Sequence, residues 1–368
     1  MASFQKRGKT WQYTISRYVD GKLKPIRKGG FRTKKEAMEA AAEVEYMLKK
    51  GMVMQVKDVG FAEYFENWAH LYKNGKHKNT FKRYLNSVET VKQYFKDIPI
   101  QKITRQTYQE FLNWYGEGRS KETVRKLNTH IRSCVKDAID DGLITIDFTR
   151  KAEFNASKQP KKSSEKHLNF MDSLRLYRYL MKKVKTANTN TPHLLLLALV
   201  SGMRYGELVG LTRDCFDFEN NTIYIYRAWD YKDGEGFIDL KNTSSERRIG
   251  IDPMVMKIFK EHFENNQPTY NGIVFFRPTK SKTLTSEAAN KALKKMLDEL
   301  NIETKISMHG LRHTHASVLL YKGVSIQSVS KRLGHASIET TYDYYTHIIK
   351  ELEERDEKVA VNLYAVNV

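Results

Sequence analysis

Four short segments in the C-terminal half of the chain carry side chains that could together transfer a phosphodiester. Arginines can neutralise the charge on the non-bridging oxygens of a phosphate, and histidines can hydrogen-bond those oxygens or manage protons. A tyrosine hydroxyl can attack the phosphorus atom, so the set predicts transfer of a phosphodiester to a side chain without a metal. The segments are SGMRYGEL with Arg204, DLKNTSSERRIGI with Lys241, MHGLRHTHAS with His309 and Arg312, and LGHASIETTYDYYTH with His335 and three tyrosines.

Two of these segments are weak signals when each is taken alone. Arg204 follows an apolar helix that is expected to end at Gly202, and Glu207 could orient its guanidinium toward a phosphate. A purely structural pair of Arg204 and Glu207 explains the same residues. Lys241 stands at the tip of an expected hairpin, where a lysine can reach a phosphate or donate a proton to a leaving alkoxide.

The third segment has two features of helical spacing. His309 and Arg312 lie one turn apart, so a helix presents them on the same face. His309 and His313 have the i, i+4 spacing of zinc-binding helices. The glutamate of the HExxH pattern is missing, however, and Arg312 stands between the two histidines. We therefore predict no metal site.

The elements that must position these residues fall into three regions. Near the N-terminus Trp11, Tyr13 and Ile15 alternate, Asp20 and Gly21 predict a hairpin turn, and a helix follows. The next region has amphipathic helical segments with short joints, which predicts a bundle of four or five helices. The segments with the chemistry lie in a third region, where helices are mixed with a small antiparallel sheet.

These patterns predict a multidomain α+β protein. The expected parts are a small unit of β-sheet plus helix at 1–56, an all-α helical bundle at 57–150, a polar linker at 151–167, a mixed, mainly helical domain with a small antiparallel sheet at 168–350, and a short apolar tail at 351–368.

The charge balance favours a polyanionic partner. Lys and Arg number 63 against 43 Asp and Glu, which gives a net charge of +20 and a pI near 9.6. Solvated polar surfaces would explain part of this excess. The candidate DNA-binding residues are Arg17, Lys22, Lys24, Arg27 and Lys28 in the first unit, and Lys82, Arg83, Lys121 and Arg125 in the helical bundle.

The remaining composition indicates a cytoplasmic protein. Cys134 and Cys215 have neither disulfide-framework nor zinc-site spacing. The longest aliphatic run, at 194–200, is too short to span a bilayer, so no membrane role is expected.

Three segments, SGMRYGEL, HGLRHTHAS and LGHASIETTYDYYTH, closely resemble the Arg, His-x-x-Arg and Leu-Gly-His…Tyr boxes of the tyrosine recombinase family. The resemblance covers about 168–350 and is strongest to the integrases of phages and of conjugative transposons in Gram-positive hosts. It implies that Arg204 and Arg312 bind the scissile phosphate, with Lys241 as general acid for the 5′-oxygen. It also implies that His309 and His335 complete the phosphate pocket.

The resemblance further implies that one tyrosine attacks the phosphate and forms a 3′-phosphotyrosyl bond, without any cofactor. The nucleophile of the family is usually followed by a small polar residue and a histidine, and YTH at Tyr345 matches that pattern. Tyr345 lies ten residues after His335, whereas the nine-residue offset of some members would select Tyr344. We expect Tyr345 to be the nucleophile, with Tyr344 as the alternative, and Tyr342 to be a packing residue.

The expected function is therefore that of an integrase, which inserts and excises a mobile element through a Holliday junction. A type IB topoisomerase-like activity that relaxes DNA and a DNA-binding regulator without catalysis are the alternatives. The implied partners are double-stranded DNA with core and arm attachment sites, a homo-tetramer on that DNA, a DNA-bending host factor and an excisionase, in the nucleoid of a bacterial host. The tail at 351–368 could dock on a neighbouring protomer or on its own domain.

Overall fold

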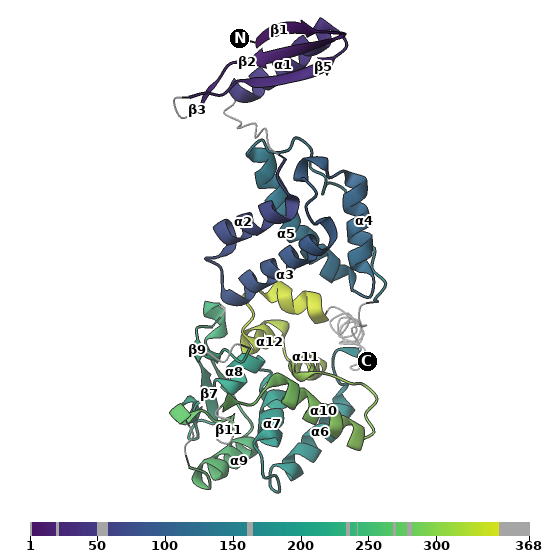
Figure 1. Cartoon of the computed structure of the whole chain (residues 1–368). Coiled ribbons are helices and arrows are strands. Elements are labelled where there is room, and N and C mark those ends of the chain that lie inside the picture. Colours follow the sequence, from purple (N-terminus) through teal and green to yellow (C-terminus); the bar gives the residue numbers. More distant parts are fainter. Residues whose placement is uncertain are drawn as a thin grey trace, which may run out of the picture. The chain divides into compact units, whose positions relative to one another are not determined.

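The computed structural model divides the chain into two compact units, Met1–Pro160 and Lys161–Val368 (Figure 1). The structure describes residues 2–19, 22–49, 58–159, 165–232, 236–240, 242–267, 270–277 and 282–345. None of the helices in these ranges has the length and apolar character needed to cross a membrane.

The first unit begins with a three-stranded antiparallel sheet that a helix covers on one face. Side chains alternate along each strand, so Tyr13, Ile15 and Ile26 reach the same face and pack under the helix. The helix starts where Thr33 Oγ1 accepts a hydrogen bond from the backbone N–H of Glu36 at 3.1 Å. The elements are β1 (Ala2–Arg7), β2 (Thr10–Ile15), β3 (Tyr18–Val19), β4 (Lys22–Leu23), β5 (Ile26–Phe31) and α1 (Lys34–Lys49), with sheet order β1-β2-β5 and a separate β3-β4 pair.

Among the described residues, four α-helices form most of the rest of the first unit. Thr104 and Ser120 start two of them, because each side chain accepts a hydrogen bond from a backbone N–H of the first turn. Their apolar faces meet in an aromatic core that includes Phe61, Phe95 and Phe111. The helices are α2 (Phe61–Lys73), α3 (Lys78–Phe95), α4 (Arg105–Gly116) and α5 (Lys121–Asp140).

The described part of the expected linker, 151–159, packs against this bundle. The backbone N–H of Glu153 donates to Gln109 Oε1 at 2.8 Å, and the backbone N–H of Gly118 donates to Ser157 Oγ at 2.7 Å. Phe154 contributes to the aromatic core of the bundle. These residues are therefore held on the bundle by side-chain packing and by hydrogen bonds.

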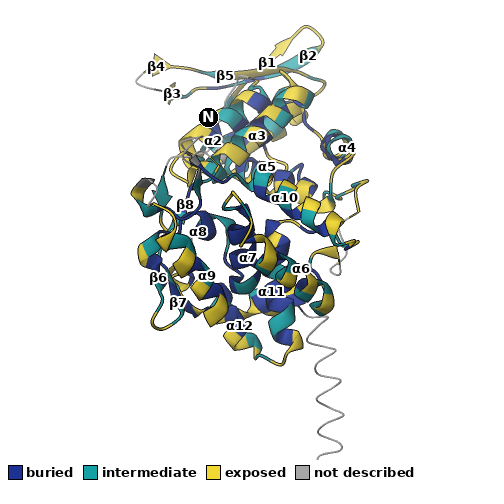
Figure 2. Cartoon of the chain, turned by 90° about the horizontal axis from the view of Figure 1, so that it is seen from below, coloured by how far each residue is buried: buried dark blue, intermediate teal, exposed yellow. Residues whose placement is uncertain are grey.

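The second unit is mainly helical and is built around one apolar helix. Almost every residue of that helix is buried, as its dark blue colour in Figure 2 shows, because other helices of the unit pack against it. The helices are α6 (Phe170–Lys183), α7 (Thr191–Ser201), which is the central one, α8 (Tyr205–Val209), α9 (Pro253–Glu264), α10 (Ser286–Glu299), α11 (Met308–Tyr321) and α12 (Ile326–Leu333). Residues 338–345 are also helical.

The strands of the second unit form several small sheets rather than the single sheet that the sequence suggested. Among the described residues the largest has three antiparallel strands in the order β10-β7-β6, and two two-stranded pairs accompany it. The multidomain α+β fold class is confirmed. The strands are β6 (Phe216–Asp217), β7 (Thr222–Ile225), β8 (Ala228–Trp229), β9 (Phe237–Ile238), β10 (Arg247–Gly250), β11 (Phe276–Arg277) and β12 (Lys282–Thr283).

Candidate active site

Arg204 lies at the turn between α7 and α8, where the sequence placed it. Gly202 ends α7 with a φ of 66°, a left-handed conformation that glycine adopts without strain. The backbone N–H of Arg204 donates to Glu207 Oε2 at 2.9 Å, and its Nη1 donates to Glu207 Oε1 at 2.8 Å. Arg204 Nη1 also donates to Ser245 Oγ at 3.1 Å. The carboxylate of Glu207 therefore holds both the main chain and the side chain of the arginine.

Arg312 reaches the same region from α11. Its side chain is buried, and it donates through Nη1 to the carbonyl oxygen of Gly202 at 2.8 Å and through Nη2 to that of Leu333 at 2.9 Å. Arg204 Nη2 donates to the carbonyl oxygen of Gly334 at 2.9 Å. The end of α12 therefore joins the two arginines that the sequence placed 108 residues apart.

A third arginine, Arg247 on β10, belongs to the same cluster, and our reading of the sequence missed it. Its Nε donates to the carbonyl oxygen of Arg332 at 2.7 Å, and its Nη2 donates to Glu207 Oε2 at 2.9 Å. A usable signal was the alternation along the strand, because buried Ile249 lies two residues on and shares its face. The carbonyl oxygens of 332, 333 and 334 thus each accept a hydrogen bond from a different arginine, at a helix end whose dipole attracts cations.

The two predicted histidines differ in their surroundings. His335 Nδ1 lies 2.7 Å from the hydroxyl of Thr341, which is fully buried. Burial and the positive charge of Arg312 lower the pKa of His335 to about 4, so the ring is neutral near pH 7. His309 is exposed near the start of α11, and its ring centre lies 4.7 Å from that of His313. A neutral His335 can hydrogen-bond a phosphate oxygen only through the nitrogen that carries its proton.

The tyrosines near the end of the described chain also differ. Tyr345 is 3% exposed, packs beside Leu333, and has its hydroxyl 2.9 Å from His313 Nδ1. Burial raises the pKa of Tyr345 above its ordinary value, so the hydroxyl keeps its proton in this arrangement. Tyr344 is 52% exposed and Tyr342 is 45% exposed. The prediction that Tyr342 packs is therefore wrong, and the packed tyrosine is Tyr345.

Two further histidines on α11 lie close to the site. His313 contacts the hydroxyl of Tyr345, and its i, i+4 spacing from His309 was the signal that had suggested only a metal. His315 is buried, with Nδ1 3.0 Å from the carbonyl oxygen of Leu199, and its Nε2 accepts a hydrogen bond from Arg332 Nε at 2.9 Å. Within the ranges that the structure covers, no group of three or more His, Cys, Asp or Glu side chains could hold a metal ion.

The other predicted site residues are Lys241, the tail and the candidate DNA-binding residues. Lys241 and the tail at 351–368 lie outside the described residues. Arg17 is only partly exposed, and its Nε is buried without a hydrogen-bond partner. Arg125 is paired with Glu122 on the same helix. The candidate DNA-binding residues with exposed side chains are Lys22, Lys24, Arg27, Lys28, Lys82, Arg83, Lys121 and Arg125.

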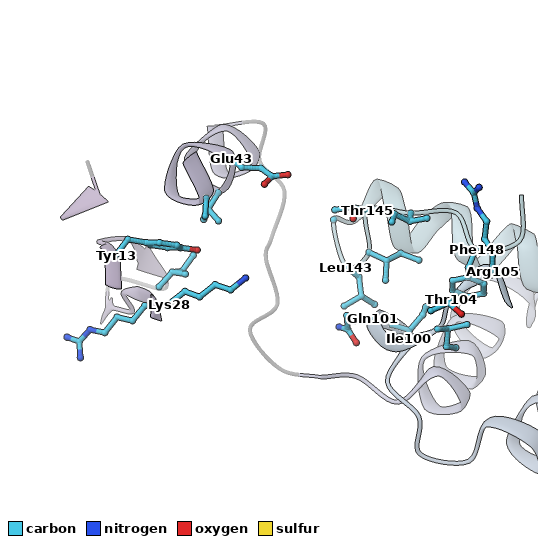
Figure 3. Close-up of a pocket in the computed structure, with 18 of the residues that line it drawn as sticks. Tyr13, Lys28, Glu43, Ile100, Gln101, Thr104, Arg105, Leu143, Thr145 and Phe148 are labelled. Carbon is cyan, nitrogen blue, oxygen red and sulfur yellow. The ribbon is translucent and has the colours of Figure 1, made fainter. Parts of the chain in front are cut away.

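A cavity in the first unit is lined by none of the predicted catalytic residues. Figure 3 draws 18 of its lining residues, which include members of two separate apolar clusters. Tyr13 belongs to the cluster of the small sheet, whereas Ile100 and Phe148 belong to that of the helical bundle. Arg27 and Lys28 also line it. We assign no catalytic role to this cavity.

Comparisons with known proteins agree with this geometry. A model of the phage integrase family matches residues 168–351, a model of an arm DNA-binding domain matches 3–46, and a model of a phage integrase SAM-like domain matches 60–155.

Curated relatives extend over nearly the whole chain. A tyrosine recombinase XerC-like protein of Caldanaerobacter subterraneus is 27% identical over 94% of this chain and 95% of its own length. The integrase of Staphylococcus phage L54a is 26% identical over 83% of this chain and 94% of its own length.

Solved structures show the same fold at low identity. The integrase of transposon Tn1549, bound to a circular intermediate DNA, matches with a TM-score of 0.67 and 17% identity, over 81% of this chain and 99% of its own. A lambda integrase dimer on a core site matches with a TM-score of 0.61 and 16% identity, over 90% of this chain and 91% of its own.

The chain belongs to the phage integrase family. It is an enzyme of the tyrosine recombinase class, which cleaves and rejoins DNA at specific sites. The relatives are named recombinases, integrases and a transposase, so neither DNA relaxation alone nor a regulator without catalysis is favoured.

Proposed function

We propose that Arg204 and Arg312 bind the scissile phosphate of a DNA strand and that Tyr345 attacks it. The observation that supports this most directly is the convergence of both arginines on the end of α12, immediately before His335. The hydroxyl of Tyr345 is held against α11, the helix that also carries Arg312. Two guanidinium groups at one point can neutralise the charge that develops on the non-bridging oxygens in the transition state.

In the proposed reaction the hydroxyl oxygen of Tyr345 forms a bond to phosphorus, and its proton passes to the ring of His313, whose Nδ1 lies 2.9 Å from that oxygen. The bond from phosphorus to the 5′-oxygen breaks, and Lys241 donates a proton to that oxygen. His309 and His335 hydrogen-bond the phosphate oxygens. The products are a 3′-phosphotyrosyl link and a free 5′-hydroxyl, so a 5′-hydroxyl of another strand can reverse the reaction without a cofactor.

The nucleophile can be tested with a nicked suicide substrate, whose short cleaved fragment diffuses away and traps the covalent adduct. Tyr345→Phe should form no adduct and still bind the DNA, whereas Tyr344→Phe should form it. Both changes remove one hydroxyl from adjacent positions, so each is the control for the other. Adduct formation by Tyr345→Phe and its loss in Tyr344→Phe would assign the role to Tyr344.

We propose a division of DNA binding that follows the expected parts of the chain. Residues 1–56 bind arm-type sites, 57–150 bind the core site, 168–350 carry out the cleavage there, and 151–167 connect the two. The family models matched at 3–46 and 60–155 support the first two assignments. The exposed basic residues of both parts suit contacts to phosphates. Removing residues 1–56 should abolish arm-site binding and leave core-site cleavage measurable, and loss of both would contradict this division.

We also propose that the working form is a homo-tetramer on two DNA duplexes, which integrates and excises a mobile element. A lambda integrase tetramer bound to a Holliday junction is among the similar structures and supports this assembly. The tail at 351–368 docks on a neighbouring protomer. A DNA-bending host factor and an excisionase set whether the reaction integrates or excises the element. The reaction takes place in the cytoplasm, at a bacterial nucleoid. A variant without residues 356–368 should assemble poorly on paired sites in native gels, and normal recombination by it would contradict docking between protomers.

A further inference from the structure

We propose that Arg247 is a positioning residue, which holds Arg204 in place through Glu207 and through the turn that follows α12. The proposal deepens the proposed function and rests on it, because it presumes that Arg204 binds the scissile phosphate. It adds to the site a residue that reaches the phosphate only through another side chain.

The contacts of Arg247 point inward from β10. Its side chain is 7% exposed, and all three guanidinium nitrogens donate to protein acceptors. Nε donates to the carbonyl oxygen of Arg332 at 2.7 Å, Nη1 to that of Ser245 at 2.6 Å, and Nη2 to Glu207 Oε2 at 2.9 Å. The fork of an arginine can fill three directions at once, which the single ammonium of a lysine cannot do with the same geometry.

This pattern separates Arg247 from the two arginines that we assign to the phosphate. Within the part of the chain that the structure describes, the hydrogen bonds of Arg204 and of Arg312 use only Nη1 and Nη2. No acceptor in that part of the chain takes a hydrogen bond from their Nε groups, whereas all three guanidinium nitrogens of Arg247 donate to the protein. Arg247 therefore acts on the other residues of the site and not on the phosphate.

Glu207 is the first route from Arg247 to Arg204. The carboxylate is 3% exposed and divides its oxygens, with Oε1 toward the side chain of Arg204 and Oε2 toward the backbone of Arg204 and toward Arg247. Burial alone would raise the pKa of Glu207, but the charges of Arg247 and Arg204 bring it below its ordinary value. Without Arg247 the carboxylate is left with one counter-charge and can rotate, and Arg204 rotates with it.

The turn after α12 is the second route. Gly334 has a φ of 70°, and a Cβ atom at this position would lie 2.8 Å from Arg247 Nη1, so the turn rests directly on the guanidinium. The carbonyl oxygen of Gly334 is also the acceptor for Arg204 Nη2, and His335 is the next residue. Removing the Arg247 side chain therefore loosens one acceptor of Arg204 and the start of the segment that carries His335.

The neighbouring residue supplies a matched control. Arg248 has the same side chain, lies on the opposite face of β10 and is exposed. Its guanidinium lies 4.5 Å from the centre of the Tyr224 ring and takes no part in the cluster. Arg248→Ala removes the same charge from the same strand and should cleave DNA at the rate of the unmodified protein.

The test compares the rate of single-turnover cleavage on two nicked substrates, one with the natural phosphodiester and one with a neutral methylphosphonate at the scissile position. On the natural substrate we expect Arg247→Ala to slow cleavage by about 100-fold, the size of effect that misplacement of a reacting group by about 1 Å produces. The methylphosphonate carries one negative charge less at its non-bridging positions, so its transition state depends less on neutralisation by a guanidinium. On that substrate the cleavage rates of Arg204→Ala and of Arg247→Ala should each lie within about 5-fold of the rate of the unmodified protein, because a guanidinium contributes mainly by neutralising the charge of the phosphate.

A merely structural role gives a different result, namely the same loss on both substrates. In the Arg204→Ala background on the methylphosphonate, Arg247→Ala should add no further loss, whereas additive losses would contradict action through Arg204. Thermal unfolding shows whether the variants fold. If Arg247→Ala does not fold, Arg247→Lys is measured in the same way, since it keeps the charge and loses the three-way contact.

The outcomes also separate this inference from the proposed function. Cleavage by Arg247→Ala or Arg247→Lys at the unmodified rate overturns the inference and leaves the function intact. Cleavage of the natural substrate by Arg204→Ala at the unmodified rate overturns the phosphate-binding role on which both depend.

Discussion

Replacing Gly202 with alanine tests how tightly the turn before Arg204 is packed. Gly202 has a φ of 66°, and a Cβ atom there would lie 2.7 Å from His315 Cδ2 and 2.9 Å from Leu333 Cδ2. Its carbonyl oxygen also accepts the hydrogen bond from Arg312 Nη1. The substitution therefore strains the backbone and pushes against two buried side chains beneath the arginines.

The expected magnitude has three parts. The left-handed conformation destabilises the folded state by about 1–2 kcal/mol for a residue with a Cβ. The lower entropy of the unfolded chain with alanine offsets about 0.4–1 kcal/mol of this loss. Overpacking against His315 and Leu333 adds about 1–3 kcal/mol. We therefore expect the free energy of unfolding to fall by about 2–4 kcal/mol, which at roughly 3 °C for each kcal/mol lowers Tm by about 6–12 °C.

Gly323 offers a matched control for the packing part. Its φ is 82°, and a Cβ atom there would meet nothing within 4 Å, so Gly323→Ala loses stability only through the strained backbone conformation. Thermal unfolding of both full-length variants, followed by circular dichroism, should show a loss of about 1 kcal/mol or less for Gly323→Ala. Cleavage should also slow more in Gly202→Ala, because the acceptor of Arg312 moves. Equal losses of Tm in the two variants would refute the packing argument.

Three other changes have expected results. Glu207→Gln should lower the free energy of unfolding by about 3–5 kcal/mol, since Arg247 and Arg204 lose the buried carboxylate that is their counter-charge. Glu122→Gln in an exposed pair should change it by about 0–1 kcal/mol, and urea unfolding measures both. Burial lowers the pKa of His193 to about 4 from its ordinary 6.5. Below about pH 6.5 the unfolded chain takes up a proton at His193 that the folded chain does not, so the free energy of unfolding falls as the pH is lowered toward 4. His193→Leu should therefore flatten the fall of the urea midpoint between about pH 7 and 4.5. Arg27→Ala should reduce the slope of log affinity for arm-site DNA against log salt by about 0.9, and an unchanged slope would exclude a phosphate contact.

The sequence was most informative where short-range spacing decides the structure. Glycine at the end of an apolar helix predicted the turn that presents Arg204, and the observed left-handed Gly202 follows from that preference. The i, i+3 relation of Arg204 and Glu207 predicted their pairing, which the structure shows. The sheet face formed by Tyr13 and Ile15 followed from alternation.

Long-range and main-chain contacts were not accessible in the same way. Two partners of Arg247 lie far away in the sequence, on α8 and at the end of α12, and the third is the carbonyl oxygen of nearby Ser245. Two of the three acceptors are therefore carbonyl oxygens, which no side-chain pattern reveals. Tyr342 was misplaced for a different reason. Tyr345 lies four residues after buried Thr341 and shares its face, whereas Tyr342 is turned about 100° away from Thr341 on a helix of 3.6 residues per turn.

The three carbonyl oxygens at the end of α12 have a consequence for how the site can vary. Main-chain acceptors are present whatever side chains stand at 332–334, so a point substitution there cannot delete them. An insertion or deletion of one residue in the same turn would instead displace all three arginines together. These acceptors therefore survive a change of residue type at 332 or 333 but not a change in the length of the turn, whereas Gly334 is fixed by its left-handed backbone and by its contact with Arg247. Both constraints set a limit for grafting or redesigning the loop that carries His335.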